Sequence, residues 1–359
     1  MAKRVFLHIG LPKTGTTYLQ DIMWSQRHEL ATQGFLLPGF RRQHLWAALD
    51  VCAHASLSRR HPDAPGSWKR LVASVIEYPG DAIVSHEFLC GASAAQASSA
   101  ISDLAPAEVH LIISARDTLG MVTSGWQESI KNGDSWRMDD ILTASPQAGP
   151  EFGWATWDLS EVLSRWTPSL PSAQVHILPM PSRTAGPVEH WRNFAGVIRI
   201  DPGPFEAPEA PANVSLGVVQ VELLRRLNPH LGPLRDTALR RGEYIRGYLA
   251  ETLLAKQGGN RLAPSSSMVK ECRTRASRAV SLIETGEFDV RGAIENLEVP
   301  EHVDLHPSTA EVSEAELLEA AMLLIADLAD DVRLLRESAP AARASSGSRS
   351  RVRRRWWAR

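Results

Sequence analysis

One short segment near the start of the chain combines the residue types that bind phosphate-like anions. Residues 10–17 read Gly-Leu-Pro-Lys-Thr-Gly-Thr-Thr and so bring together one lysine, two glycines and three threonines. An ammonium group attracts an anion, hydroxyls donate hydrogen bonds to it, and glycine lets main-chain N–H groups approach it closely. The segment therefore predicts the binding of a phosphate-like oxyanion, with Lys13 as the cation.

The elements around this segment can position it. A largely apolar run, Val5 to Ile9, comes before it, and a helical pattern with Leu19, Ile22 and Met23 comes after it. A strand that leads through a glycine-bearing loop into a helix presents unpaired N–H groups and the positive end of the helix dipole at one point. We therefore expect an anion-binding βα junction. An ordinary βα turn with a surface lysine is the alternative.

The order of the residues separates this loop from the Walker A motif. That motif places its lysine after the last glycine and adds a hydroxyl that binds magnesium, whereas Lys13 precedes Gly15. The order Pro-Lys-Thr-Gly-Thr-Thr resembles the 5′-phosphosulfate loop of sulfotransferases that use 3′-phosphoadenosine 5′-phosphosulfate (PAPS). The resemblance implies that Lys13 stabilises the departing bisphosphate and that the loop holds the 5′-phosphate and the sulfonate through Pro12, Lys13, Thr14, Gly15, Thr16 and Thr17.

A second candidate anion site follows another apolar strand pattern at residues 108–115. The strand leads into Arg116-Asp117-Thr118, where Asp117 or Thr118 can cap the next helix. Arg116 precedes this helix and Ser124 lies two turns inside it, so a guanidinium and a hydroxyl can converge on one phosphate. An arginine and a serine with this spacing form the 3′-phosphate element of sulfotransferases. The resemblance therefore implies that Arg116 and Ser124 bind the other end of PAPS.

Two candidates for a general base follow a third strand. Residues 82–85 form a short apolar pattern that leads into His86-Glu87. An acceptor hydroxyl or amine must lose a proton, and either side chain can accept it. Cytosolic sulfotransferases end this strand in Thr-His, which Ser85-His86 resembles, whereas glycan-modifying members use a glutamate. Because neighbouring residues of an extended chain point to opposite faces, only one should aim at the acceptor. We favour Glu87 and keep His86 open.

The alternation of strand and helix patterns predicts an α/β fold. In a parallel sheet, ligands bind at the carboxyl ends of the strands, so the loop 10–17, His86-Glu87 and Arg116 can share one crevice. We expect a P-loop-like three-layer fold with a central parallel sheet flanked by helices. The expected divisions are a PAPS-binding core at 1–200, a proline-rich loop at 201–215, a helical C-terminal part that completes the domain at 216–338, and a disordered basic tail at 339–359.

A late loop at residues 258–267 joins two of the C-terminal helical patterns. In sulfotransferases a late loop with basic residues closes over the nucleotide, so the resemblance makes Arg261 the candidate for that contact. A plain surface loop is the alternative. The chain lacks the Arg-Lys-Gly-x-x-Gly-Asp-Trp segment of cytosolic aryl and steroid sulfotransferases. It resembles bacterial and glycan-type members more closely.

Composition narrows the class of protein. The net charge of the 359 residues is −2, so no global basic field indicates nucleic acid as a partner. The three cysteines share no metal-like spacing, and we expect reduced thiols in a cytoplasmic protein without a metal. No signal peptide and no apolar run of membrane-spanning length is expected. Abundant Ala and Arg are typical of GC-rich bacterial genomes.

Together these patterns predict a nucleotide-binding enzyme, a PAPS-dependent sulfotransferase. It would move a sulfuryl group to a hydroxyl or amine of a glycan or small metabolite. A P-loop nucleotide or small-molecule kinase is disfavoured by the position of Lys13 and by the lack of an acidic strand end for magnesium. A non-catalytic nucleotide-binding protein is the other alternative. The acceptor, the oligomeric state and the role of the tail stay open, and the rings available to stack on an acceptor are Trp136, Trp154 and Trp157.

Overall fold

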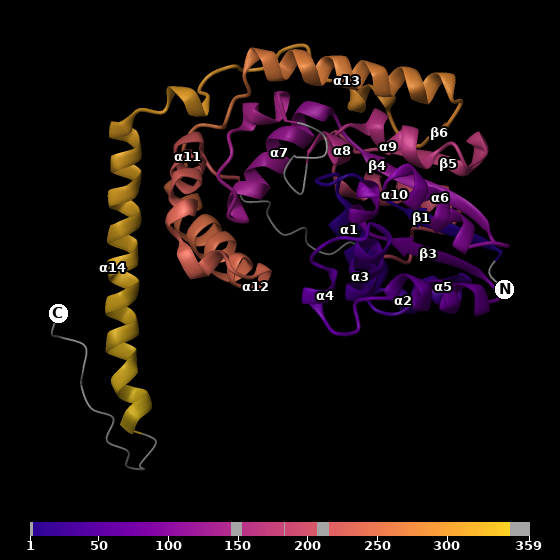
Figure 1. The fold of residues 1–359 in the computed structure, drawn as a ribbon, viewed down its shortest axis with the longest axis horizontal. Helices are drawn as coiled ribbons and strands as arrows, with labels where there is room; N and C mark the ends of the chain where they lie inside the picture. Colours follow the sequence, from indigo (N-terminus) through magenta and orange to yellow (C-terminus); the bar gives the residue numbers. More distant parts are fainter. Residues whose placement is uncertain (1–2, 145–152, 183, 207–214, 345–359) are drawn as a thin grey trace.

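A six-stranded parallel sheet forms the centre of the molecule. The computed structural model describes residues 3–144, 153–182, 184–206 and 215–344. The strand order is β2-β3-β1-β4-β5-β6, and every neighbouring pair is parallel. The strands are β1 (Arg4–His8), β2 (Phe35–Leu36), β3 (Asp81–Ser85), β4 (Glu108–Ala115), β5 (Val175–Pro179) and β6 (Asp289–Val290). The predicted α/β class with a central parallel sheet is therefore confirmed (Figure 1).

The register of the three central strands brings their carboxyl ends to one level. β1 lies between β3 and β4, and Val5 is opposite Ala82 on one side and Val109 on the other. At the end of β1, His8 is opposite Ser85 and Ile112. The loops that follow β1, β3 and β4 consequently start from the same edge of the sheet, where ligands of parallel sheets bind.

The side chains of β1 alternate between two separate cores. Val5 and Leu7 belong to one, Phe6 belongs to the other, and all three are buried. A strand that is apolar on both faces is typical of a sheet covered by helices on each side. The helices in contact with the core of Phe6 are α1 (Thr16–Ser25), α2 (Arg27–Thr32) and α10 (Pro187–Ile198). Those of the larger core include α3 (Arg41–Val51), α5 (Ser67–Glu77), α6 (Ala94–Asp103), α7 (Thr118–Lys131), α8 (Trp154–Trp157) and α9 (Leu159–Trp166).

The C-terminal helical part shares the larger core. Its elements are α11 (Val218–Leu227), α12 (Ala238–Arg240), the π-helix η6 (Arg241–Leu254), α13 (Ser266–Thr285) and α14 (Glu314–Ala344). α13 packs against α7 and α9, and the chain returns to the sheet as β6 before α14. α14 then runs along one side of the molecule and extends beyond it (Figure 1).

Two helical stretches are interrupted by turns. α3 and α4 (Leu57–Arg60) are separate helices, because the chain turns at Ala53 with a positive φ of 48°. The stretch from Gly232 to Leu254 is divided into a 3₁₀ turn, α12 and η6, since Gly232 has a φ of 45° and Pro233 follows it. α14 continues to Ala344, past the expected boundary at residue 338. Residues 207–214 and 345–359, which include most of the expected proline-rich loop and tail, lie outside the described residues.

Candidate active site

The loop after β1 turns through two residues with left-handed backbone angles. Lys13 and Gly15 have positive φ angles of 63° and 77°, and Gly15 is the N-cap of α1. Because Gly15 has no side chain and the first turn of α1 carries no acidic residue, no side-chain acceptor at the cap competes for the first N–H groups of this helix. A Cβ at position 15 would lie 3.1 Å from Cδ2 of His190. The start of α1 therefore has no side-chain cap, and position 15 has no room for a larger residue.

The threonines of the loop have different surroundings. Thr14 is fully buried, and its hydroxyl donates a 2.6 Å hydrogen bond to the carbonyl of Leu11. Its single proton is thus used inside the loop in this structure, which leaves the main-chain N–H of Thr14 as the donor for a ligand to meet. Thr16 is buried at the start of α1, whereas Thr17 is exposed.

Lys13 is paired with a carboxylate from a distant helix. Its Nζ lies 3.3 Å from Oε2 of Glu128 in α7, and Oε1 of Glu128 lies 2.8 Å from Nη1 of Arg246 in η6. Burial raises the pKa of Glu128, but Lys13, Arg246 and Lys131 lower it by more, so the net direction is downward. Glu128 is therefore an ionised bridge between the loop and the C-terminal helical part.

Ser124 lies on the same side of α7 as Glu128, and Arg116 lies just before this helix. Gly120, Ser124 and Glu128 follow each other at intervals of four, which places them on successive turns of one helix side, and Arg116 is four residues before Gly120. The hydroxyl of Ser124 donates to the carbonyl of Gly120 at 2.6 Å, and a Cβ at Gly120 would collide with the guanidinium of Arg116. One turn of helix, about 6 Å, separates Ser124 from the residue that contacts Lys13. The structure thus brings the two predicted anion sites together at one edge of the sheet.

Local sequence explains how α7 holds Arg116. Asp117 is the N-cap, and its carboxylate accepts a 2.5 Å hydrogen bond from the N–H of Gly120. The same carboxylate lies 3.4 Å from Nη2 of Arg116. The guanidinium is therefore fixed between the end of β4 and the first turn of α7, with only part of its charge neutralised.

The two candidate bases differ in their hydrogen bonds. Nδ1 of His86 accepts from the N–H of Phe88 at 3.2 Å, and burial lowers the pKa of His86 despite the opposing effect of Glu87. Glu87 is more exposed, and its Oε2 accepts a 3.4 Å hydrogen bond from Nε2 of Gln20 in α1. Glu87 therefore faces the helix that begins at the phosphate loop, while His86 caps the turn Glu87–Gly91.

Three buried histidines contact residues at this edge of the sheet. His8 is fully buried between the hydroxyls of Ser85 and Ser114, at 2.9 and 2.8 Å. His44 in α3 accepts from the N–H of Ser85, and His190 in α10 packs under Gly15. Burial lowers the pKa of His8 to about 3 and the pKa values of His44 and His190 to about 4. Sequence reasoning missed His44 and His190, because an isolated histidine in a helical pattern carries no signal of its partner.

Arg261 and two of the predicted tryptophans, Trp154 and Trp157, have surroundings that differ from those predicted. Arg261 is exposed in a loop that is held through the carbonyl of Asn260, and among the described residues it forms no ion pair or hydrogen bond with the loop at residues 10–17. Arg246 is instead the cation of the C-terminal part that reaches this edge. The expectation that Trp154 and Trp157 stack on an acceptor is wrong, because both are buried and the indole N–H of Trp154 donates to the carbonyl of Ile141.

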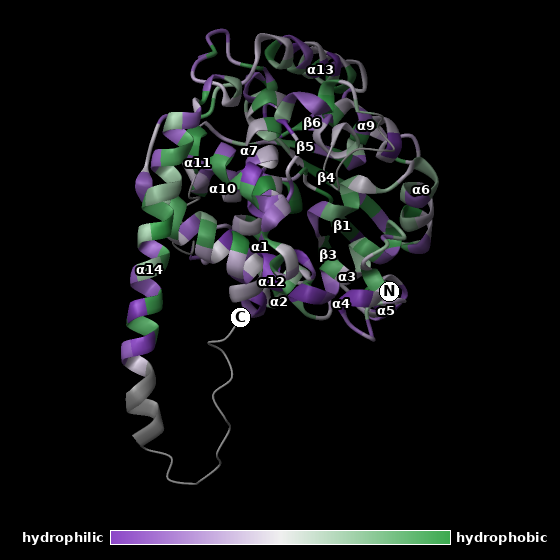
Figure 2. Cartoon of the chain, turned by 60° about the vertical axis from the view of Figure 1, so that its left-hand side comes forward, coloured by the Kyte–Doolittle hydropathy of each residue, from purple (hydrophilic) through white to green (hydrophobic). Residues whose placement is uncertain are grey.

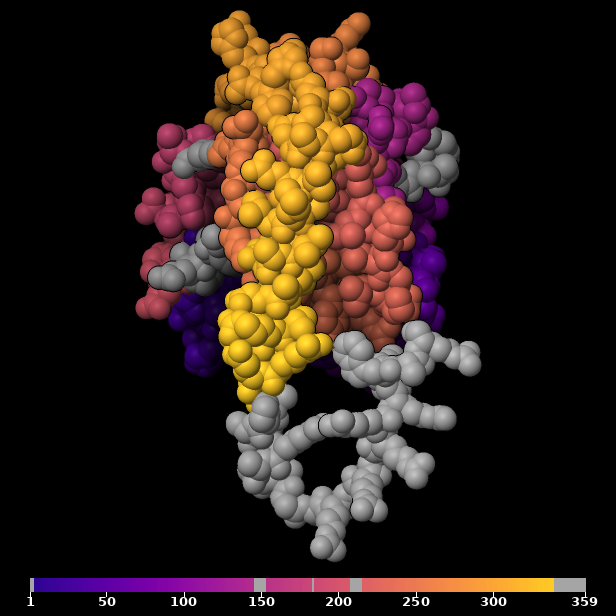
Figure 3. Space-filling model, turned by 90° about the vertical axis from the view of Figure 1, so that its left-hand side faces the viewer, coloured from indigo at the N-terminus to yellow at the C-terminus, as the bar shows by residue number. Residues whose placement is uncertain are grey.

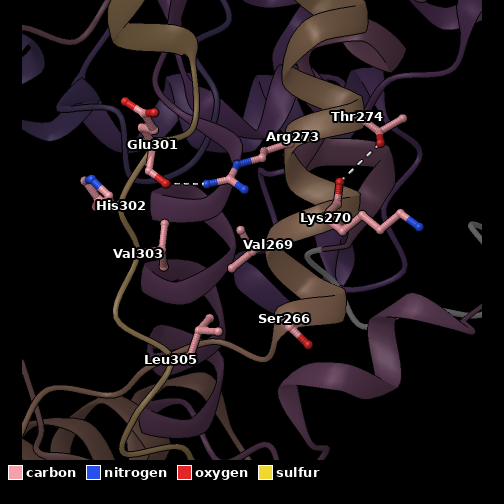
Figure 4. Close-up of a pocket in the computed structure, with 9 residues that line it drawn as sticks. All are labelled: Ser266, Val269, Lys270, Arg273, Thr274, Glu301, His302, Val303 and Leu305. Carbon is pink, nitrogen blue, oxygen red and sulfur yellow. Dashed lines mark hydrogen bonds between the residues drawn. The ribbon is translucent and has the colours of Figure 1, made fainter.

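Within the described ranges of the chain, no group of three or more His, Cys, Asp or Glu side chains is arranged to hold a metal ion. None of the helices described is both long and apolar enough to span a bilayer. A groove of about 430 Å³ lies between α13 and residues 301–305, lined by Lys270 and Arg273 among others (Figure 4). It contains none of the candidate site residues.

Comparison with known proteins gives one structural likeness. No protein-family model and no curated protein sequence matches the chain. The chain is similar to the solved structure of a sulfotransferase from Alicyclobacillus acidocaldarius, with a TM-score of 0.41 and 14% sequence identity. The match covers 67% of this chain and 100% of the other. At this level the likeness carries no conclusion about the reaction.

Proposed function

We propose that the protein is a PAPS-dependent sulfotransferase, which transfers a sulfuryl group to a hydroxyl or amine of a glycan or small metabolite. The contact between Lys13 and Glu128 is the observation that carries this proposal. It connects the lysine of the loop at residues 10–17 to the helix that bears Ser124 and that begins directly after Arg116-Asp117. A donor with a phosphosulfate at one end and a phosphate at the other needs two such cationic sites around one crevice.

The roles of the binding residues follow from their chemistry. The first N–H groups of α1, with Thr16 and Thr17, would hold the 5′-phosphate and the sulfonate. The guanidinium of Arg116 and the hydroxyl of Ser124 would hold the 3′-phosphate, after Ser124 turns from the carbonyl of Gly120. The positive φ of Gly15 supports this fit, since a larger residue there would be strained and its Cβ would lie 3.1 Å from the ring of His190, which would disturb the loop.

The transfer step requires that one negative charge be stabilised and that one proton be removed from the acceptor. The bond between sulfur and the phosphate oxygen breaks while a bond between sulfur and the acceptor oxygen or nitrogen forms. Lys13 would stabilise the negative charge on the departing phosphate, as positioned cations do in related phosphoryl transfers. Glu87 would take the acceptor proton. The exposure of its carboxylate supports this choice over His86, whose Nδ1 already accepts from Phe88.

Lys13 must leave Glu128 to reach the donor. Leaving a half-buried carboxylate unpaired would be unfavourable, but Glu128 retains Arg246 at 2.8 Å. Arg246 would thus act as a positioning residue that lets Lys13 exchange one anion for another. The whole network links the donor site to η6, since Arg246 also contacts Glu251, which lies 3.5 Å from Lys131.

Calorimetry and a transfer assay test the proposal. Adenosine 3′,5′-bisphosphate should bind tightly without a metal, and better than ATP with magnesium. Lys13→Ala and Arg116→Ala should each lower ³⁵S transfer from labelled PAPS to a panel of glycans and metabolites by at least about tenfold. Tighter binding of magnesium ATP would instead support a kinase. Binding of the bisphosphate without transfer to any acceptor would support a non-catalytic protein.

A further inference from the structure

Helix α14 is attached to the molecule along only one of its sides. Leu317, Ala320 and Leu324 are between 4% and 6% exposed, and α14 packs there against α11 and η6. Further along the same side, Asp327 pairs with Lys256 at 2.8 Å and Asp331 accepts from Tyr248. Figure 3 shows the helix lying across the surface of these elements with its outer side uncovered.

The outer side carries an apolar row with the spacing of a coiled coil. Leu318, Met322, Ile325, Ala329 and Val332 follow each other at intervals of four, three, four and three. All five are exposed in this structure, Leu318 by 61% and Ile325 by 64%. Such a repeat forms one continuous seam on a helix and fits the matching seam of another helix. It lies opposite the side that packs on the body, and Figure 2 shows apolar positions along the helix.

We propose that α14 pairs with α14 of a second copy of this chain in an antiparallel two-helix coiled coil. In that arrangement Met322 lies opposite Val332 of the second copy, and Ile325 lies opposite its Ala329. The two bodies then sit on opposite outer sides of the helix pair, because each body contacts the face away from the seam.

Charge favours the antiparallel direction over the parallel one. When the seams align as above, Glu319 at a flanking position meets Arg333 of the second copy, twice by symmetry. Both side chains are exposed. A parallel pair would instead place Glu314 beside Glu319 of the other helix, and like charges at flanking positions repel.

Charge also disfavours a lipid surface as the occupant. Between residues 314 and 338 the helix carries seven acidic and two basic side chains. Helices that bind membrane surfaces are rich in Lys and Arg, which are attracted to anionic lipids. The acidic helix is repelled by such lipids, so a second protein helix is the better partner for the seam.

Analytical ultracentrifugation of the full chain tests the pairing. The protein should sediment as a dimer, and Ile325→Lys, at the centre of the seam, should weaken association by at least about tenfold. Leu323→Lys is the matched control, because Leu323 is 51% exposed on the same helix but lies off the seam. The control should remain dimeric. Circular dichroism establishes that both variants keep their helices, and binding of adenosine 3′,5′-bisphosphate should be unchanged in both.

Charge reversal tests the direction. Glu319→Arg and Arg333→Glu should each weaken the dimer, and the double variant should restore it. Tighter association of Glu319→Arg would overturn the antiparallel arrangement, because it would relieve the repulsion of a parallel pair. A wild-type protein that stays monomeric at concentrations on the order of 100 µM would overturn the proposal, as would a dimer unaffected by Ile325→Lys. A monomer that binds anionic vesicles would show that lipid occupies the seam instead.

Discussion

Nζ of Lys13 lies 3.3 Å from Oε2 of Glu128, although 115 positions separate the two residues in the chain. The contact joins the loop after β1 to the middle of α7. Glu128 is one helical turn beyond Ser124. The ion pair thus holds the loop beside α7 and leads to specific expectations about anion binding.

Removal of the Glu128 carboxylate should strengthen anion binding at the loop. Glu128→Gln frees Lys13 from its partner, and a half-exposed ion pair contributes about 0.5–1 kcal/mol. We expect adenosine 3′,5′-bisphosphate to bind about two- to fivefold more tightly in calorimetry. Glu251→Gln is the control, since Glu251 contacts Arg246 and Lys131 but has no contact with Lys13. Weaker binding to Glu128→Gln would contradict the competition between donor and carboxylate.

The guanidinium of Arg116 should contribute to nucleotide binding specifically through the 3′-phosphate. Arg116→Lys keeps the charge but loses the two-pronged donor geometry. Binding of adenosine 3′,5′-bisphosphate should weaken by about tenfold, while binding of adenosine 5′-monophosphate should change little. Calorimetry with both nucleotides checks this. An equal loss of affinity for the two nucleotides would indicate that Arg116 does not bind the 3′-phosphate.

The general base can be assigned by single replacements. Glu87→Gln should lower kcat by on the order of a hundredfold or more, whereas His86→Gln should have a smaller effect. Because burial lowers the pKa of His86, this ring is neutral at neutral pH and its charge does not change there. The pH profile of kcat in His86→Gln should therefore keep the wild-type shape above neutral pH. The reverse order of losses would make His86 the base.

Gly15 should be sensitive to a methyl group for two reasons. Its φ of 77° is unfavourable for alanine, at roughly 1–2 kcal/mol, and the new Cβ would lie 3.1 Å from the ring of His190. Gly15→Ala should lower both the free energy of unfolding and the affinity for adenosine 3′,5′-bisphosphate. Gly34→Ala provides the control, because Gly34 has a φ of 87° with no atom within 4 Å of the added carbon. It should be strained similarly but leave nucleotide binding unchanged.

Mild acid should destabilise the fold through its buried histidines. The pKa values of His8, His44 and His190 are lowered to between about 3 and about 4. As the pH falls below about 6.5, the unfolded chain takes up protons that the folded chain excludes. The free energy of unfolding should thus fall by about 1.4 kcal/mol per pH unit for each histidine, and the loss is complete only below the folded pKa values. Urea titrations at pH 7 and pH 5 measure this, and His190→Gln should show a shallower dependence.

Local patterns predicted the parts of the fold that have local causes. The buried strands β1, β3 and β4 are apolar runs, and the residues after them reach one edge because parallel strands in register end together. The strands β2 and β6 have two residues each, too few for any period to show. The two-sided burial of the sheet follows from the same apolar runs.

The contacts between distant side chains could not be predicted. Arg246 reaches Glu128 only because η6 folds back onto α7, and no spacing in the chain encodes that approach. Trp154 and Trp157 were expected at an acceptor pocket, but helical periodicity does not say which face of a helix meets the core. The same limit concealed His44 and His190, whose positions depend on packing against the phosphate loop and β3.

A chain of short contacts connects the rim of the site to His8. Nε2 of Gln20 donates to Oε2 of Glu87 at 3.4 Å and to Oγ of Ser85 at 3.3 Å. Oγ of Ser85 lies 2.9 Å from Nδ1 of His8, and Oγ of Ser114 lies 2.8 Å from Nε2 of the same ring. A single imidazole thereby joins three neighbouring strands of the sheet, and one amide links it to the carboxylate proposed as the base.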